Sequence, residues 1–190
     1  MVNWDPVREI VESSAVWAEF IYRDELDSTN RYLRNNEDLE TGAVVLADRQ
    51  THGHGRGSRK WYSPEGGLWF SFSIGGMTSR STQELYVDLL NIVQGLLEEY
   101  GVETTVSRPN DLVVGNKKIA GLLIEKNTGN CIVGIGINVN NEASSLPEVV
   151  KENSTTMKKV TGEEIDRVAL LRDFLTGFES FYRTETGSDG

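Results

Sequence analysis

The fold is decided by the stretch DLVVGNKKIAGLLIEKNTGNCIVGIGINVN, residues 111–140. Apolar runs rich in β-branched residues alternate here with two turn signals, Gly-Asn and Thr-Gly-Asn. Connections this short join antiparallel neighbours, because a parallel pair needs a crossover of roughly a dozen residues or more. The stretch therefore predicts an antiparallel meander, to which VETTVS at residues 102–107 adds another strand.

Three further strands are predicted upstream of the meander, at residues 18–26, 42–50 and 67–76. The helical spacing of apolar residues predicts two longer helices, one over residues 81–100 and one over residues 161–182. Strands that neighbour one another in sequence, with helices bunched between groups of them, predict an α+β fold with a mixed, largely antiparallel sheet.

Chain length, net charge and cysteine content limit the classes of function that are possible. With 190 residues the chain is expected to form a single domain, residues 1–190. Its net charge of −10 argues against non-specific nucleic-acid binding, which needs a basic surface. The sequence has no signal-peptide pattern and no apolar run of about 18 residues, and its lone Cys131 lies in an apolar run. We therefore expect a cytoplasmic protein that uses neither nucleic acid nor a membrane as partner.

A glycine-rich basic loop, QTHGHGRGSRKW at residues 50–61, stands out on this acidic background. Its glycines are Gly53, Gly55 and Gly57, and its cations are Arg56, Arg59 and Lys60. Glycines let the backbone approach a ligand and point amides at it, so the loop is typical of an anion site. The spacing matches neither a Walker P-loop nor a Rossmann fingerprint.

A second polar cluster lies in RPNDLVVGNKKIAG, residues 108–121. It holds Asn110, Asp111, Lys117 and Lys118 within a short strand-turn-strand. A lysine beside a turn is usually only solvated, but Lys118 borders a strand that should be buried on one side. There it could neutralise charge that develops on a phosphate or carboxylate.

Five ordered motifs carry a family resemblance. They are DSTN, QTHGHGRGSRKWYSP, GGLWFS, RPNDLVVGNKKIAGLLIE and GIGINVN. In this order and at these separations, the chain resembles the catalytic domain of the biotin protein ligase (biotin-[acetyl-CoA-carboxylase] ligase) family over residues 25–182. The resemblance implies a fold like that of class II aminoacyl-tRNA synthetases and biotin and lipoate ligases.

The resemblance also implies a two-step acyl transfer. Biotin and Mg²⁺-bound ATP would give biotinyl-5′-AMP and pyrophosphate, and a lysine on the biotin carboxyl carrier domain of a carboxylase would then attack the mixed anhydride. The implied biotin-binding residues are Ser28, Thr29, Asn30, Gln50, Gly53, His54, Gly55, Arg56, Trp69, Lys118 and Gly121. The implied ATP-binding residues are Arg56, Arg59, Trp61, Asn110, Lys118 and Asn138. Lys118, Arg56 and Asp111 would be the catalytic residues, and no metal-binding residues are implied.

The chain departs from the family pattern at three positions. His54 replaces the first arginine of the family's G-R-G-R, and a partly protonated imidazole binds phosphate less strongly than arginine does. Ser107 and Arg108 replace the lysine and tryptophan of K-W-P-N-D-L. These replacements predict weaker retention of the adenylate and weaker binding of ATP.

The resemblance also bears on domain organisation. At 190 residues the chain has no room for the DNA-binding domain that precedes the catalytic domain in bifunctional members, and it ends before their small C-terminal β-domain. We therefore expect both to be absent. Members often form homodimers edge to edge, and the resemblance leaves a monomer and a homodimer equally open.

Two alternatives to a biotin ligase stay open. One is a lipoate or octanoate transferase of the same superfamily, which the polar loop at residues 50–61 disfavours because the R-R-x-S-G-G-G type of loop is absent. The other is a catalytically weakened protein that binds biotin or its adenylate without efficient transfer. Substitution of Lys118 would separate an active ligase, which would lose adenylation, from a mere binder.

Overall fold

A computed structural model describes residues 2–36, 38–77, 80–107, 109–126, 130–142 and 146–187. Within these ranges seven strands form one sheet in the order β1-β2-β3-β7-β6-β5-β4. The strands are β1 (Glu19–Leu26), β2 (Ala43–Gln50), β3 (Leu68–Ile74), β4 (Thr105–Ser107), β5 (Asp111–Val114), β6 (Lys117–Lys126) and β7 (Cys131–Ile137). Strands β1 and β2 are parallel, and every other neighbouring pair is antiparallel. The predicted meander and the α+β fold with a mixed, largely antiparallel sheet are therefore confirmed.

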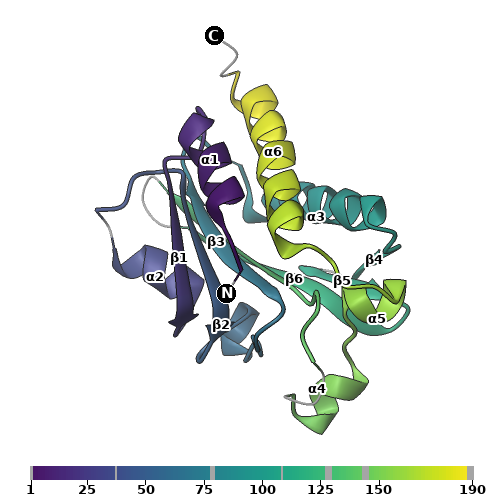
Figure 1. Cartoon of the computed structure of the whole chain (residues 1–190). Coiled ribbons are helices and arrows are strands. Elements are labelled where there is room, and N and C mark those ends of the chain that lie inside the picture. Colours follow the sequence, from purple (N-terminus) through teal and green to yellow (C-terminus); the bar gives the residue numbers. More distant parts are fainter. Residues whose placement is uncertain are drawn as a thin grey trace.

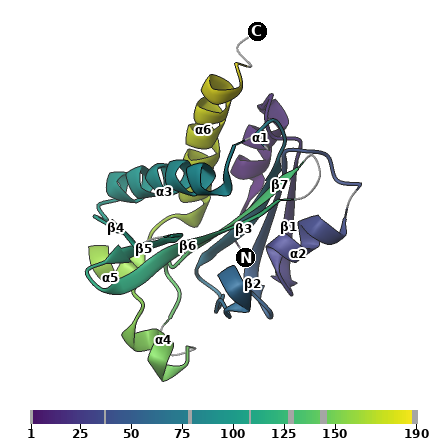
Figure 2. The same cartoon turned by 180° about the vertical axis from the view of Figure 1, so that it is seen from behind.

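Helices cover the two faces of the sheet unequally. They are α1 (Asp5–Ser13), α2 (Thr29–Asn35), α3 (Thr82–Glu99), α4 (Glu148–Glu152), α5 (Met157–Thr161) and α6 (Arg167–Thr186), with a 3₁₀ turn η1 (Arg56–Ser58). Helices α1, α3 and α6 lie over one face, and the short α2 lies on the other (Figure 1). Figure 2 shows the α2 side, where much of the sheet is not covered by helices.

The alternation of side chains along β3 explains this arrangement. Leu68, Phe70 and Phe72 point into the large core beneath α1, α3 and α6, where Phe70 and Phe72 pack against Phe174 of α6. Ser71 points to the opposite face, toward α2. One face is therefore a large aromatic and aliphatic core. The other combines polar groups with a smaller apolar cluster beneath α2, formed by Leu33, Ala43, Val45 and Ile132.

The last helix begins later than the sequence indicates. It starts at Arg167, not at residue 161, because the Asp166 side chain accepts hydrogen bonds from the backbone N–H groups of Val168 and Ala169 (2.8 and 3.2 Å). Residue 161 instead ends α5, where Gly162 adopts a left-handed conformation with φ of 84°. The prediction missed α4 and α5, which are only five residues long.

The described helices are too short or too polar for membrane insertion. None of those within the described ranges combines the length and the apolarity that a membrane span requires.

Candidate active site

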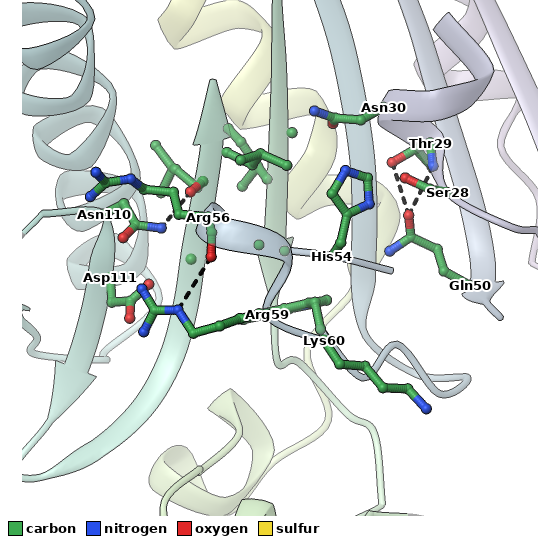
Figure 3. Close-up of a pocket in the computed structure, with 18 of the residues that line it drawn as sticks. Ser28, Thr29, Asn30, Gln50, His54, Arg56, Arg59, Lys60, Asn110 and Asp111 are labelled. Carbon is green, nitrogen blue, oxygen red and sulfur yellow. Dashed lines mark hydrogen bonds between the residues drawn. The ribbon is translucent and has the colours of Figure 1, made fainter. Parts of the chain in front are cut away.

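A pocket of about 140 Å³ opens between the N-terminal end of α2, the glycine-rich loop and strands β5, β6 and β7. Figure 3 shows its labelled side chains in two groups. Ser28, Thr29 and Gln50 lie together on one side, and Asn110 and Asp111 lie on the other. The pocket is therefore polar at both ends.

Glycines on neighbouring strands form the floor of the pocket. Gly121 of β6 pairs in register with Gly136 of β7, so the two lie side by side. The indole ring of Trp61 rests on them: a Cβ at Gly136 would lie 2.7 Å from the ring, and one at Gly121 would lie 3.0 Å from it. Only glycine leaves room for the ring at these positions. Its Nε1 is buried with no hydrogen-bond partner among the described residues.

Lys118 meets two different partners beside this floor. Its Nζ lies 2.7 Å from Asp111 Oδ1 and 4.6 Å from the centre of the Trp61 ring. A Cβ at Gly121 would come within 3.1 Å of the Lys118 and Asp111 side chains. A third of the Lys118 side-chain surface is exposed. A cation is thus held at the pocket by a carboxylate and an aromatic face, and it remains accessible to an anionic ligand.

The first turn of α2 forms the opposite wall. Ser28 caps the helix, and Thr29 and Asn30 follow it, all three nearly fully buried. Gln50, the last residue of β2, accepts a hydrogen bond from the Thr29 backbone N–H (2.8 Å) through Oε1 and donates to Ser63 Oγ (2.7 Å) through Nε2. Helix and strand therefore fix the same cluster of amide and hydroxyl groups.

The glycine-rich loop folds over the pocket from a narrow base. Gln50 and Ser63 form a bridge at that base, and His54 and Lys60 form another further out. A Cβ at Gly53 would lie 2.6 Å from the Trp61 carbonyl oxygen, so glycine lets the two sides of the loop approach. Gly57 in η1 has a φ of 61°, which favours glycine.

Three loop side chains differ in their surroundings. The Arg56 guanidinium lies 5.9 Å from the centre of the Tyr86 ring of α3. His54 is half-buried, and its Nδ1 has no hydrogen-bond partner among the described residues. His52 is exposed and contacts Thr51 Oγ1 through its Nδ1 (2.9 Å).

The pocket is locally basic although the chain carries a net charge of −10. Among the described lining residues, Arg56, Arg59, Lys60 and Lys118 oppose the single carboxylate of Asp111. Such a cluster attracts anions and stabilises negative charge that develops in a reaction. No three His, Cys, Asp or Glu side chains of the described chain gather as they would around a metal ion.

Most of the residues singled out from the sequence line this one pocket. They are Ser28, Thr29, Asn30, Gln50, His54, Gly55, Arg56, Arg59, Trp61, Asn110, Asp111, Lys118 and Gly121. Arg108 lies outside the described residues, and Ser107 is exposed at the end of β4.

Three of the singled-out residues lie just behind the lining. Trp69 is fully buried, contacts the Trp61 ring edge-on at 6.1 Å and donates from its indole N–H to the Pro64 carbonyl oxygen (2.9 Å). Asn138 donates from its side-chain amide to the Lys118 carbonyl oxygen (3.4 Å), so it holds the backbone of that lysine. Gly53 shapes the loop.

Several lining residues were not singled out from the sequence. Gly134 and Gly136 form part of the pocket floor, Leu123 contributes apolar surface, and Ser71 joins the α2 wall by a hydrogen bond. Glycines inside a strand signal close approach by another group, so GIGINV carried a usable signal for Gly134 and Gly136. Leu123 carried no comparable signal, because the sequence around it predicts only a strand.

Comparison with known proteins places this pocket in a family. Residues 22–141 match the model of the Biotin/lipoate A/B protein ligase family. A curated relative, the Bifunctional ligase/repressor BirA of Bacillus subtilis (strain 168), is 33% identical over 93% of this chain and 58% of its own length. BirA of Escherichia coli (strain K12) is 30% identical over 82% of this chain and 52% of its own length. The chain thus spans little more than half the length of these two relatives.

A solved structure extends the likeness to three dimensions. The biotin protein ligase from Aquifex aeolicus, in complex with biotin and ATP, superposes with a TM-score of 0.78 at 37% identity, covering 85% of this chain and 68% of that one. The residues that match the family model, 22–141, include the α2 wall, the glycine-rich loop and strand β6, which carries Lys118. The chain therefore belongs to the biotin/lipoate A/B protein ligase family.

Proposed function

We propose that the chain is a biotin protein ligase, which activates biotin with ATP and transfers it to a lysine of a carrier protein. The observation that carries the proposal is the placement of Lys118, paired with Asp111 and stacked on Trp61, across a small pocket from the polar α2 wall. Relatives and a solved neighbour named as biotin ligases support this reading.

In the first step a carboxylate oxygen of biotin attacks the α-phosphorus of ATP. The bond from that phosphorus to the bridging oxygen breaks, and pyrophosphate leaves. The step gathers negative charge from a triphosphate and a carboxylate, so it needs fixed cations. Lys118 would lie between the two groups, Arg56 and Arg59 would follow the phosphates, and Mg²⁺ would arrive with ATP as part of the substrate.

In the second step the neutral amine of the carrier lysine attacks the acyl carbon of biotinyl-5′-AMP. An amide bond forms, AMP leaves and the nitrogen loses a proton. Asp111 lies where a carboxylate could hold the incoming amine. The loop that carries His54 and Arg56 would keep water from the reactive anhydride, because it folds over the pocket.

The test is biotin-dependent exchange between ATP and pyrophosphate, with lipoate and octanoate as competing acids. Exchange with biotin alone is expected, because the biotin protein ligase from Aquifex aeolicus (37% identity) resembles the chain more than the putative lipoate protein ligase from T. acidophilum does (16% identity). Exchange with lipoate or octanoate but not biotin would overturn the proposal in favour of the second branch of the family. Biotin binding without exchange would identify a weakened binder.

Transfer would be measured with an isolated biotin carboxyl carrier domain as acceptor. We expect a biotin–lysine amide by mass spectrometry, and none when the acceptor lysine is replaced. We further propose that the protein acts in the cytoplasm. Light scattering at increasing concentrations would distinguish a monomer from the edge-to-edge homodimer.

A further inference from the structure

A continuous row of side-chain hydrogen bonds runs behind the α2 wall. Thr29 Oγ1 lies 2.6 Å from Ser71 Oγ, and Ser71 Oγ lies 2.6 Å from Asn30 Oδ1. Asn30 Nδ2 donates to Glu125 Oε2 (2.8 Å), and Arg34 donates to the other oxygen, Oε1 (2.9 Å). The row joins β3, α2 and β6, and Thr29, Asn30 and Ser71 are almost fully buried.

Glu125 fixes the direction of every bond in this row. An ionised carboxylate only accepts hydrogen bonds, so Asn30 must turn its NH₂ group toward Glu125 and its oxygen toward Ser71. Ser71 must then donate to Asn30, and its remaining lone pairs accept the hydroxyl hydrogen of Thr29. The reverse orientation of Asn30 would set two acceptors 2.8 Å apart.

The direction decides what the wall offers a ligand. Thr29 Oγ1 also lies 3.2 Å from Gln50 Oε1, but Ser71 is closer and has already spent its own hydrogen on Asn30, so the Thr29 hydrogen goes to Ser71. The Thr29 oxygen then presents lone pairs to the pocket that it lines. The second amide hydrogen of Asn30 has no recorded acceptor among the described residues. An acceptor beside a donor complements a neutral ring that carries N–H and C=O groups side by side, which is the chemistry of a cyclic urea.

We propose that Glu125 is a positioning residue that sets the hydrogen-bond direction of the α2 wall and thereby its affinity for the ureido ring of biotin. The proposal rests on the proposed function, because biotin supplies that ring. Glu125 itself lies behind Asn30, and it stays ion-paired to Arg34 with 29% of its side chain exposed. It acts through Asn30.

The decisive variant is Glu125→Gln, which keeps the shape and removes the charge. Arg34 would donate to the carbonyl oxygen of the new glutamine side chain. The NH₂ group of that glutamine would then face Asn30 and force the Asn30 side chain to turn. We expect the KM for biotin to rise about tenfold, because the donor and the acceptor of the wall exchange places and a hydrogen bond to the ureido ring is lost. The kcat and the KM for ATP should change less than twofold.

Two control variants separate this effect from a loss of stability. Arg34→Gln removes the second partner but leaves the carboxylate facing Asn30, so its KM for biotin should stay within twofold of the wild type. Glu185→Gln breaks a comparable ion pair with Arg80 far from the pocket and should change neither KM. A tenfold effect in either control, or none in Glu125→Gln, would overturn the proposal.

A measurement without ligand keeps the proposal independent of the biotin assignment. Proton–proton NOEs from the Asn30 side-chain NH₂ should reach the Glu125 methylenes in the wild type and shift to Ser71 in Glu125→Gln. If the amide turns but wild-type protein shows no exchange with biotin, the direction-setting role stands and the proposed function fails. If exchange occurs and the amide does not turn, the function stands and the role of Glu125 is refuted.

Discussion

At the scale of single residues, Lys118 shows how the pocket holds a cation before any substrate arrives. The Asp111 carboxylate and the Trp61 ring position its ammonium group, and the Lys118 backbone is held by hydrogen bonds to Asn153 and Thr155. Little side-chain motion is then needed when an anion binds. Preorganisation of this kind lowers the cost of stabilising charge in a reaction.

Lys118→Ala should abolish most of the activity and little of the stability. We expect the rate of biotin-dependent ATP–pyrophosphate exchange to fall by a factor on the order of 100 or more, because a fixed charge is lost from the reacting centre. The ion pair is partly exposed, so the free energy of unfolding should change by less than about 1 kcal/mol. Lys117→Ala is the control, since this neighbour is exposed and does not line the pocket. Equal losses in both variants would contradict a specific role for Lys118.

Gly134 is required for a different reason, the close approach of Asn30. A Cβ at this position would lie 2.1 Å from Asn30 Oδ1, so Gly134→Ala must displace that side chain. We expect a loss of about 1–3 kcal/mol in stability, together with weaker biotin binding. Urea unfolding and calorimetric titration would measure the two effects.

Gly95→Ala is the matched control for Gly134. Gly95 lies within α3 and has nothing within 4 Å of an added Cβ, so the substitution should raise stability by about 0.5–1 kcal/mol. Biotin binding should stay the same. A destabilised Gly95→Ala would show that the packing around α3 is tighter than the structure indicates.

At the scale of elements, α2 is short for the work it does. The first turn of this seven-residue helix forms one wall of the pocket, and a helix of this length is not stable alone. The Ser28 cap, the Arg31–Asp27 ion pair and the contacts with β2, β3 and β7 hold it in place. Conditions that loosen this end of α2 should therefore reach the pocket directly.

Acid is one such condition. Burial opposes ionisation of Asp27, but hydrogen bonds from the Arg31 guanidinium and the Ser28 N–H outweigh it, and the pKa of Asp27 lies below its ordinary value. A carboxyl group with a lowered pKa stabilises the fold above its unfolded pKa of about 4 and loses that contribution as the pH falls through the lower folded value. Asp27→Asn should therefore cost at most about 0.5 kcal/mol at pH 7, since the group is 42% exposed.

Urea unfolding of wild type and Asp27→Asn at pH 7, 5 and 3 checks this dependence. The difference in free energy of unfolding should be the same at pH 7 and 5 and should shrink at pH 3. A difference that grows toward low pH would have the wrong sign for a lowered pKa.

The element scale also shows what sequence can and cannot predict. The long strands carry period-two alternation, and α3 carries helical spacing, so both were predicted. Helices α4 and α5 are too short for a periodic signal, and the true cap of α6 at Asp166 competed with an equally plausible Thr161. A local sequence pattern cannot decide which of two possible capping residues starts a helix when the packing of the connecting segment determines the choice.

The site follows the same division. Motif residues such as Thr29, Gln50 and Lys118 could be singled out along the chain, but their mutual contacts depend on the strand order β3-β7-β6. The reason for a glycine at 136 is the ring of Trp61, which comes from a distant loop. The proposed role of Glu125 could not be predicted either, because a charged residue near the end of a strand is usually expected to be solvent-exposed.

At the scale of the whole molecule, the two faces of the sheet divide the work. Helices α1, α3 and α6 bury one face and form the large hydrophobic core with it, while the other face carries the pocket. Cys131 lies at the start of the central strand β7 within the buried face, as the sequence indicated for a small buried residue. Its thiol is therefore a natural reporter of global unfolding.

Burial raises the pKa of Cys131 to about 11, so the thiolate is scarce at pH 8 and the side chain is inaccessible. We expect no reaction of native protein with a thiol reagent over minutes, and fast reaction in concentrated urea. The S180C variant, which adds a thiol on the exposed side of α6, should react at once at a single site. Rapid labelling of Cys131 in the native protein would mean that β7 opens without global unfolding.

The narrow base of the glycine-rich loop has a consequence for how such enzymes diversify. Gln50, at the end of β2, and Ser63 bond to each other and hold the two ends of residues 51–62 together, so the segment between them can vary while its ends stay in place. Its length and chemistry can change at the modest entropic cost of a longer loop, without disturbing the sheet. Replacement of an arginine by His54 is one such exchange. Grafting the corresponding segment of a relative between these two anchors would transplant its ligand retention while leaving the scaffold and its folding intact.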